Sequence, residues 1–423
     1  MPEKYELSDG AVLVADLMPQ SRSVSVGFWV NVGSRDELQQ QRGFSHFTEH
    51  MLFKGTRKRS CFDIARQVDT MGGEINGSTG KEATDYYINI ASPHLQNALE
   101  LLIDIFFQSS FGRDEFEKER LVILDEIELI RDDPEELVSD LFSAVLWGEH
   151  PLGHPVIGEK ETIGAMRIKA LKEFYKLSYI PAHLVVSVAG GFESAELIGM
   201  VDTLLRTVDR TRGSGYPIRE RKKPVPKVGR VCHHRELEQV YFNCGGEGCS
   251  YRDEERYALA LFNIIAGSSY SSRLFQRVRE REGLCYSIGS SIVSYCDGGE
   301  FSIGFSTSLK NLPRVLEAVN RELKLLKQGD ISVEELENAK ARFKGNYILS
   351  QESNEWKMAR MAMHEIIFGR IVPYEETIDK IERVNLDDLN RLASRLLQGA
   401  LFSSACLGPE GTERRFHDWQ FCF

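Results

Sequence analysis

Two histidines lie four residues apart in the stretch GFSHFTEHMLFKGT, which spans residues 43–56, and a glutamate directly precedes the second. On a helix, residues four apart are neighbours on one surface, so the side chains of His46 and His50 could both reach a single point. This is how a helix presents two nitrogen ligands to one metal ion. Glu49 belongs to the same face and would lie beside that ion.

The apolar residues of this stretch show why its histidine face needs a partner. Residues 43–54 are expected to form a buried helix whose apolar stripe holds Phe44, Phe47 and Met51 and which ends at Lys54-Gly55. Two imidazoles and a carboxylate on the adjacent face are costly to bury unless they are paired or bound to a metal.

A third ligand has to come from elsewhere in the chain, because a catalytic zinc uses three protein ligands and one open position for water. The best candidate lies on a helix expected over residues 114–130, where Glu115, Glu119 and Glu126 share one stripe. Its opposite side is apolar and contains Phe116, Ile123, Ile127 and Ile130. A solvated acidic face is the simpler interpretation for Glu115. Glu126 stands inside the apolar run LVILDEIELI and is the preferred third ligand.

Length and composition limit the classes of protein. With 423 residues the chain exceeds the usual size of one core, so two domains of roughly 200 residues are expected. The formal net charge of -11 argues against nucleic acid as a partner. There is no signal pattern and no apolar run near the roughly 18 residues of a membrane helix, so no membrane partner is expected. Eight scattered cysteines without a CxxC pair favour reduced thiols in a cytoplasmic protein.

The position of the domain boundary follows from composition. Gly, Pro and charged residues concentrate in DRTRGSGYPIRERKKPVPKV, residues 209–228, which is typical of a linker. We expect an N-terminal domain over 1–210, a linker over 211–229 and a C-terminal domain over 230–423.

The two halves repeat each other in three places and in the same order. VSVGFWVNVGSRDE has a counterpart in QVYFNCGGEGCSYRDEE, so that Arg35 aligns with Arg252 at an offset of 217. A strand followed by an amphipathic helix occurs in residues 85–106 and again in 300–326. The helix that comes next occurs in residues 114–130 and again in 333–349. These matches predict an α+β fold of two homologous domains, each a largely antiparallel sheet with helices packed on one face.

The histidine cluster occurs in the first copy only. The second copy has Asn263 in place of His46, and Asn346 near the position of Glu126. We therefore expect the N-terminal domain to bear the metal and the C-terminal domain to be a degenerate copy without zinc ligands.

The string HFTEH, followed 76 positions after His50 by Glu126, resembles the inverted-motif zinc peptidases of the pitrilysin and insulinase family. The resemblance covers almost the whole chain, through GGEINGSTGKEATDYY, ERLVILDEIELIRDDPEE, HPLGHPVIGEKETI and SSRLFQRVREREGLCYSIGS. The chain is similar to the short two-domain bacterial members and to the β-subunit of mitochondrial processing peptidase.

The resemblance implies a role for each matching residue. It implies that His46, His50 and Glu126 bind one zinc ion per chain and that Glu49 is the general base. Glu119, seven residues before Glu126, matches a glutamate that supports the ligands.

In the second half, Arg279 and Tyr286 match an arginine and tyrosine pair that reaches the active site and steadies the substrate carbonyl. Without the resemblance, Tyr286 would be interpreted as a half-buried strand aromatic and Arg279 as a surface charge on a helix.

The resemblance also implies where peptide binds. Asn76, Gly77, Ser78 and Thr79 match an edge strand that takes up peptide by β-augmentation. Two residues depart from the family pattern: Gly77 stands where Ala is common, and Thr48 where Leu is common. Gly77 could loosen the grip on substrate, whereas Thr48 is expected to point away from the metal face.

Short members of the family are implied to build a clamshell chamber as dimers, so a homodimer is expected, with a heterodimer as the other possibility. Three functions remain open. The first is a zinc endopeptidase that cuts unfolded peptides, and the second is a binding or assembly subunit with little turnover. The third is a structural zinc protein, which would need four protein ligands, and the sequence shows no fourth.

Overall fold

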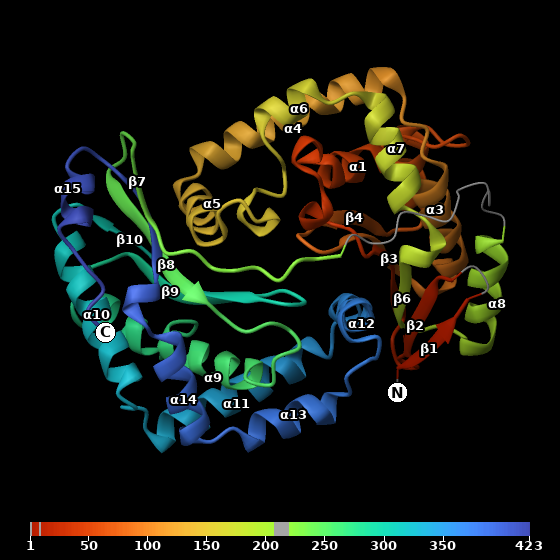
Figure 1. The fold of residues 1–423 in the computed structure, drawn as a ribbon. Helices are drawn as coiled ribbons and strands as arrows, with labels where there is room; N and C mark the ends of the chain where they lie inside the picture. The colour runs from red at the N-terminus through yellow and green to blue at the C-terminus, as the bar shows by residue number, and fades with distance from the viewer. Residues whose placement is uncertain (1, 8–9, 207–219) are drawn as a thin grey trace. The chain divides into compact units, whose positions relative to one another are not determined.

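The computed structural model describes residues 2–7, 10–206 and 220–423 (Figure 1). Residues 207–210 of the expected first domain and 211–219 of the expected linker lie outside the described residues. The boundaries expected at 210 and 230 stay a prediction. The chain divides into two compact units that interleave along the sequence: unit 1 is Met1–Glu128, Pro155–Lys222 and Ile348–Ile371, and unit 2 is Leu129–His154, Lys223–Tyr347 and Val372–Phe423.

Unit 1 is built on a six-stranded sheet with the order β1-β2-β6-β3-β5-β4. All neighbouring strands are antiparallel except β2 and β6. The strands are β1 (Glu3–Glu6), β2 (Val12–Leu17), β3 (Ser23–Val30), β4 (Glu74–Thr79), β5 (Thr84–Ala91) and β6 (Leu184–Gly190). Strand β4 pairs with β5 alone and is the edge of the sheet next to the histidine helix (Figure 1).

Helices cover both faces of this sheet, because successive residues of the buried strand β3 point to opposite faces. Phe28 meets Phe106 of the main helical layer, with ring centroids 5.6 Å apart. Its neighbour Trp29 packs with Met358 on the other face. The helices of unit 1 are α1 (Phe44–Leu52), α2 (Cys61–Thr70), α3 (Leu95–Gln108), α4 (Arg113–Asp132), α6 (Lys160–Ala165), α7 (Ile168–Ser178), α8 (Ser194–Leu205) and α12 (Asn354–Phe368).

Unit 2 repeats this plan with a five-stranded sheet in the order β7-β11-β8-β10-β9, in which β7 and β11 are parallel. The strands are β7 (Arg230–His234), β8 (Gln239–Glu247), β9 (Ser287–Ser294), β10 (Gly299–Ser308) and β11 (Ser403–Gly408). Its helices are α5 (Pro134–Trp147), α9 (Arg256–Ala266), α10 (Leu312–Lys327), α11 (Val333–Ser350), α13 (Tyr374–Arg383), α14 (Leu386–Leu396) and α15 (Thr412–His417).

Each unit takes one helix from the other half of the chain. Helix α12 of the second half packs on β6, β3 and β2 of unit 1, and α5 of the first half packs on β11 and β8 of unit 2. The exchange is symmetric, because each helix follows a long helix that ends the repeat, α4 or α11. The predicted α+β fold of two homologous domains with largely antiparallel sheets is confirmed. The expectation that helices pack on one face only is wrong, because the exchanged helices α12 and α5 cover the second face of each sheet.

Two further expectations concern the chain as a whole. In the described part, no helix has both the length and the apolar composition that a membrane span requires. No disulfide joins any of the eight cysteines, all of which are described.

Candidate metal centre

Helix α1 is fixed at its start by a glycine and along its length by apolar contacts. Gly43 has a φ of 89°, and a Cβ at this position would lie 2.6 Å from Ile163 Cδ1, so the start of the helix requires glycine. Phe47 and Met51 are fully buried, as expected. The structure therefore leaves His46 and His50 on the side of α1 that is partly open, with 17% of each side chain exposed.

The three predicted ligands lie together. Glu126 Oε2 is 3.9 Å from His46 Nε2 and 3.6 Å from His50 Nε2, and the three donor atoms all lie within 4.8 Å of one another. A tetrahedral zinc with bonds of about 2.05 Å places its ligand atoms about 3.3 Å apart, so small movements would close the site around the ion. Among the described residues no other His, Cys, Asp or Glu joins this group. Three donors fit a catalytic zinc and fall one short of a structural one.

The protonation state of His46 suits metal binding. Burial, and secondly the neighbouring His50, lowers the pKa of His46 to about 4. The ring is therefore neutral at pH 7, which is the form that coordinates metals. Its Nδ1 is buried and has no hydrogen-bond partner among the described residues, so no hydrogen bond on that side of the ring sets its orientation.

His50 is held differently, by Glu119. Glu119 Oε2 lies 3.0 Å from His50 Nδ1, and Oε1 lies 2.8 Å from Lys54 Nζ. A carboxylate behind the second ring nitrogen orients a histidine ligand and turns its Nε2 toward the metal. The sequence interpretation that placed Glu119 opposite the apolar side of its helix is wrong, because Glu119 is buried beside Phe116 and Ile123. The two partners, His50 and Lys54, make this burial possible.

Glu49 is positioned by the edge strand. Thr79 Oγ1 donates a hydrogen bond of 2.6 Å to Glu49 Oε2. Burial is the main cause of a raised pKa for Glu49, and the carboxylate of Glu126 acts in the same direction. A bound dication would act in the opposite direction and favour the carboxylate. One oxygen of Glu49 is thus held by Thr79 at the end of β4.

The predicted peptide-binding residues form the exposed edge of the sheet. Asn76 and Ser78 are exposed, and the Gly77 N–H donates a hydrogen bond of 2.8 Å to Asn76 Oδ1. Strand β4 pairs with β5 alone, so its other edge presents the backbone groups that an added strand would pair with. A Cβ on Gly77 would lie 3.2 Å from the ring of Phe53, so the glycine lets β4 lie close to the end of α1. Thr48, by contrast, is fully buried, and its hydroxyl has no hydrogen-bond partner in the described part of the chain.

One supporting residue was missed by the sequence interpretation. Glu37 is buried, and its carboxylate accepts hydrogen bonds from the N–H groups of Gly43 at 2.8 Å and Ser45 at 2.6 Å. These donors belong to the N-terminus of α1, which carries His46. No local capping spacing points to a residue so far ahead of the helix. The sequence signal that could have indicated this role is the charged string Arg35-Asp36-Glu37, which stands shortly before a helix expected to be buried.

Arg279 and Tyr286 are neighbours in unit 2. The Arg279 guanidinium lies 4.6 Å from the centre of the Phe275 ring and 5.6 Å from that of Tyr286. Tyr286 is 77% exposed, so the interpretation as a half-buried strand aromatic is wrong.

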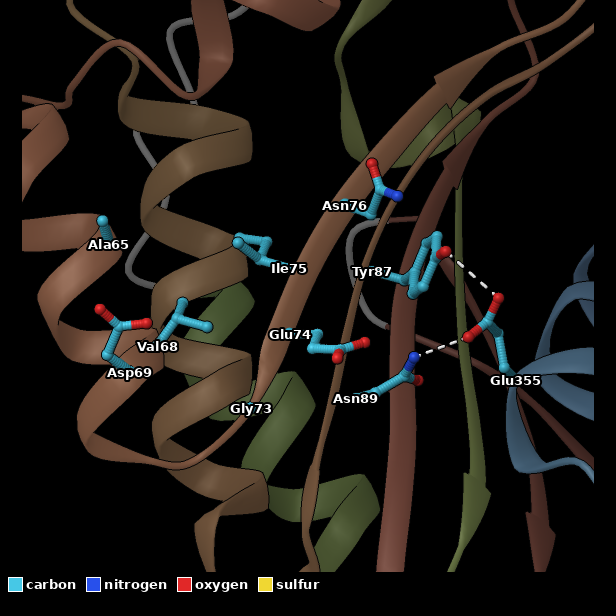
Figure 2. A pocket seen from close by; sticks show the side chains of 10 residues that line it. All are labelled: Ala65, Val68, Asp69, Gly73, Glu74, Ile75, Asn76, Tyr87, Asn89 and Glu355. Carbon is cyan, nitrogen blue, oxygen red and sulfur yellow. Dashed lines mark hydrogen bonds between the residues drawn. The ribbon is translucent and has the colours of Figure 1, made fainter.

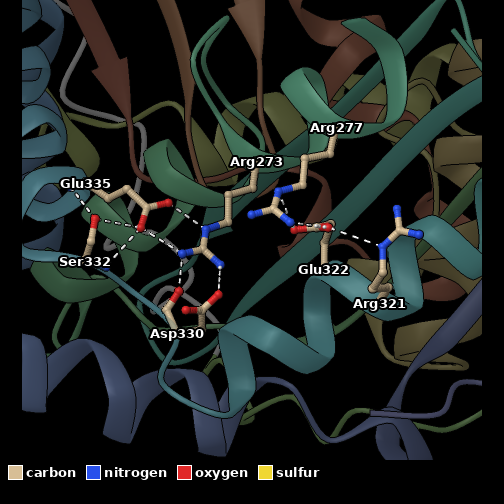
Figure 3. Close-up of polar contacts among 7 residues, drawn as sticks. All are labelled: Arg273, Arg277, Arg321, Glu322, Asp330, Ser332 and Glu335. Carbon is tan, nitrogen blue, oxygen red and sulfur yellow. Dashed lines mark hydrogen bonds and ion pairs between the residues drawn. The ribbon is translucent and has the colours of Figure 1, made fainter. Parts of the chain in front are cut away.

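Ion pairs anchor the π-helical segment Phe275–Arg281 that carries Arg279 (Figure 3). Arg277 Nε lies 3.2 Å from the fully buried carboxylate of Glu322. Just before the segment, Arg273 donates to both carboxylate oxygens of Glu335, at 2.6 and 2.7 Å. These contacts fix the backbone beneath Arg279, while its own side chain stays near the surface.

Comparisons with known proteins agree with the fold and with the family resemblance. Residues 12–160 match the family described as Insulinase (Peptidase family M16), and residues 165–343 match the one described as Peptidase M16 inactive domain. The chain is 35% identical to the "uncharacterized zinc protease YmxG" of Bacillus subtilis, over 97% of this chain and 99% of that protein. It is 34% identical to an "uncharacterized zinc protease" of Mycobacterium tuberculosis, over 98% and 94% of the two chains.

Among solved structures, a protease from Helicobacter pylori is similar in fold, with a TM-score of 0.91. The alignment covers 97% of this chain and 99% of that one at 21% identity, so this likeness concerns the fold alone. Together the matches confirm the family resemblance expected from the sequence.

Proposed function

Because this chain belongs to the insulinase family of peptidases, peptidase family M16, we propose that it is a zinc metalloendopeptidase that hydrolyses unfolded peptides. The observation that carries the proposal is the grouping of His46, His50 and Glu126 beside the carboxylate of Glu49. The names of the relatives, which are zinc proteases, support zinc as the metal, at one ion per chain.

When bound, zinc would lower the pKa of a coordinated water and polarise the scissile carbonyl. Glu49 accepts the proton of the attacking water and then delivers it to the leaving amine. Thr79 restrains Glu49 Oε2 at 2.6 Å, which leaves the other oxygen available for the proton. Glu119 keeps the His50 ring oriented from behind.

The substrate would bind as an added strand along Asn76, Gly77 and Ser78, through main-chain hydrogen bonds that do not depend on its sequence. Arg279 and Tyr286 would steady the substrate carbonyl. We further propose that the protein acts as a homodimer that encloses a chamber, with a heterodimer as the other arrangement, and that it works in the cytoplasm. Peptides are its partners in this proposal.

A second candidate is a peptide-binding or assembly subunit of a heterodimer, with little or no turnover of its own. The match of residues 165–343 to a domain described as inactive favours this reading of the second half. The complete donor set in the first half favours the peptidase.

The test combines zinc analysis with cleavage of a quenched, unstructured peptide by the wild type and Glu49→Gln. The expected result is about one zinc per chain in both proteins, with turnover lost in the variant. Zinc without cleavage in the wild type would favour the binding subunit. Absence of zinc from the wild type would overturn the proposal.

A further inference from the structure

A pocket of about 400 Å³ lies along the open edge of β4 (Figure 2). It is at the opposite end of the strand from Thr79, the residue that holds Glu49. It includes the turn residue Gly73 and the first residues of the strand, Glu74, Ile75 and Asn76. The strand rises about 3.3 Å per residue, so the five steps from Thr79 back to Glu74 span about 17 Å. The pocket is therefore continuous with the proposed peptide-binding edge but separate from the metal centre.

The two sides of this pocket differ in chemistry, as Figure 2 shows. On one side, helix α2 contributes the apolar Ala65 and Val68 together with Asp69, and Ile75 of β4 points toward this helix. On the other side, Glu355 of α12 faces Tyr87 and Asn89 of β5. Side chains of an added strand alternate between two faces, so neighbouring residues of a bound peptide would meet in turn the side with Ala65, Val68 and Ile75 and the side with Glu355.

The Glu355 carboxylate has neutral partners only. It accepts hydrogen bonds from Asn89 Nδ2 at 2.6 Å and from Tyr87 Oη at 3.2 Å. Within the described residues no lysine or arginine forms an ion pair with it. The negative charge of this wall is therefore oriented by its neighbours and not neutralised, which complements a positive charge on a ligand.

The same negative field reaches along the strand. Asp85, opposite Ser78, has its pKa raised to about 6, first by burial and then by the charges of Glu49 and Glu355, although the Ser78 hydroxyl opposes this. A cation bound beside Glu355 would relieve this repulsion.

We propose that this pocket is a side-chain subsite of the peptide-binding edge and that its Glu355 wall binds a positively charged group of the peptide. The group is a lysine or arginine side chain, or the free α-amino group of the peptide, about five residues from the bond opposite Glu49. The inference rests on the proposed function in that the ligand is a peptide lying along β4.

The test uses a neutral, unstructured peptide and a series in which one arginine is moved along it. KM is expected to fall about fivefold when the arginine is about five residues from the cleaved bond, because a partly exposed ion pair contributes that much. The side of the cut on which this occurs gives the direction of the peptide along β4. Comparing free and N-acetylated peptides separates the α-amino group from the arginine side chain.

Two variants of the α12 region assign the effect to the pocket. Glu355→Gln is expected to abolish the arginine preference, measured as the ratio of KM values for the neutral and arginine peptides. Glu352→Gln is the matched control, because Glu352 is exposed and does not line the pocket. A preference that is independent of position, or lost equally in both variants, would overturn the inference.

A binding measurement separates this inference from the proposed catalysis. Glu49→Gln is titrated with fluorescent neutral and arginine peptides, with and without Glu355→Gln. Stronger binding of the arginine peptide that depends on Glu355 supports the subsite even if the wild type cuts nothing. Turnover by the wild type without any such difference in binding would overturn the subsite and leave the peptidase standing.

Discussion

The strand order β2-β6-β3-β5-β4 of unit 1 corresponds position by position to β7-β11-β8-β10-β9 of unit 2, and each begins with its parallel pair. The helices that enter these sheets nevertheless differ. In α9, Asn263 takes the place of His46 and is buried. Its Oδ1 accepts a hydrogen bond of 2.7 Å from Ser290 Oγ. The offset of 217 puts Ala266 and Gly267 at the positions of Glu49 and His50. The shared architecture therefore stands without the polar cluster, which points to a function for the cluster in unit 1.

The segments that precede α1 and α9 differ in the same way. At the shared offset of 217, Glu37 corresponds to Glu254. Glu37 is buried and holds the start of α1, whereas Glu254 forms a 2.5 Å ion pair with Lys380 and has a side chain that is 68% exposed. The acidic residue supports the helix only in the unit that carries the candidate metal centre.

The largest effect should come from giving unit 1 the residue that unit 2 already has, through His46→Asn. An amide in place of the imidazole removes one of the three metal ligands. Loss of a residue that only supports a ligand lowers metal affinity by up to roughly a hundredfold, so loss of the ligand itself should lower it by more. Peptide cleavage should be lost with it. Competition with a chromophoric chelator measures the affinity, and circular dichroism checks that the fold is kept.

The reverse exchange, Asn263→His, is the control for this comparison. Because Ala266 and Gly267 supply no further ligands, it should bind no additional zinc. A second zinc per chain in this variant would contradict the view that unit 2 lacks a site, and unchanged zinc affinity in His46→Asn would remove His46 from the ligand set.

Glu119→Gln should have the next largest effect. An amide supports the His50 ring less well than a carboxylate and leaves Lys54 without its ion pair, so zinc affinity should fall about 10- to 100-fold. The chelator competition measures this too. Glu117→Gln is the matched control, since Glu117 lies on the same helix, is exposed and pairs with Arg120. Equal losses of zinc affinity in the two variants would show that the charge of the helix sets the affinity, and that the contact of Glu119 with His50 does not.

The sequence was sufficient where a periodic rule applied. The spacing of His46 and His50 predicts one helical face, and the two side chains do share one. The apolar run around Glu126 is a weaker guide, because the Glu126 side chain is 35% exposed, the same fraction as that of Glu115. Glu37 and Lys54 could not be assigned, because their partners are set by how the chain turns before and after α1. The exchange of α5 and α12 was also beyond reach, since an amphipathic pattern does not say which sheet a helix covers.

Glu37→Ala should lower stability by about 1 to 2 kcal/mol, because two N–H groups at the start of α1 lose their acceptor. Glu37 also predicts a pH dependence. Burial raises its pKa from 4.5 to about 8, so the folded state binds the proton more tightly than the unfolded state. This contribution to stability is complete below about pH 4.5 and is lost as the pH rises to about 8.

Denaturant unfolding at pH 5 and pH 8, in the presence of a chelator, measures this effect. The stability of the wild type relative to Glu37→Gln should be lower at pH 8 than at pH 5. Glu254→Gln should show no such difference, because Glu254 is largely exposed. A pH-independent difference for Glu37→Gln would mean that Glu37 titrates alike in the folded and unfolded states.

Thr48→Val should give the smallest effect, and the direction is opposite. Thr48 is fully buried, and no described residue forms a hydrogen bond with its hydroxyl, whereas the corresponding residue of α9 is the apolar Ile265. Valine keeps the shape and removes an unsatisfied polar group, so stability should rise by about 1 kcal/mol without a change in zinc content. Thr84→Val is the matched control: Thr84 is equally buried, but its hydroxyl donates to the Val32 carbonyl at 3.0 Å, so this variant should lose stability. If both variants lose the same stability, the Thr48 hydroxyl forms a hydrogen bond in solution. Because Ile265 of α9 has no hydroxyl, α1 would then make one polar contact that α9 cannot make.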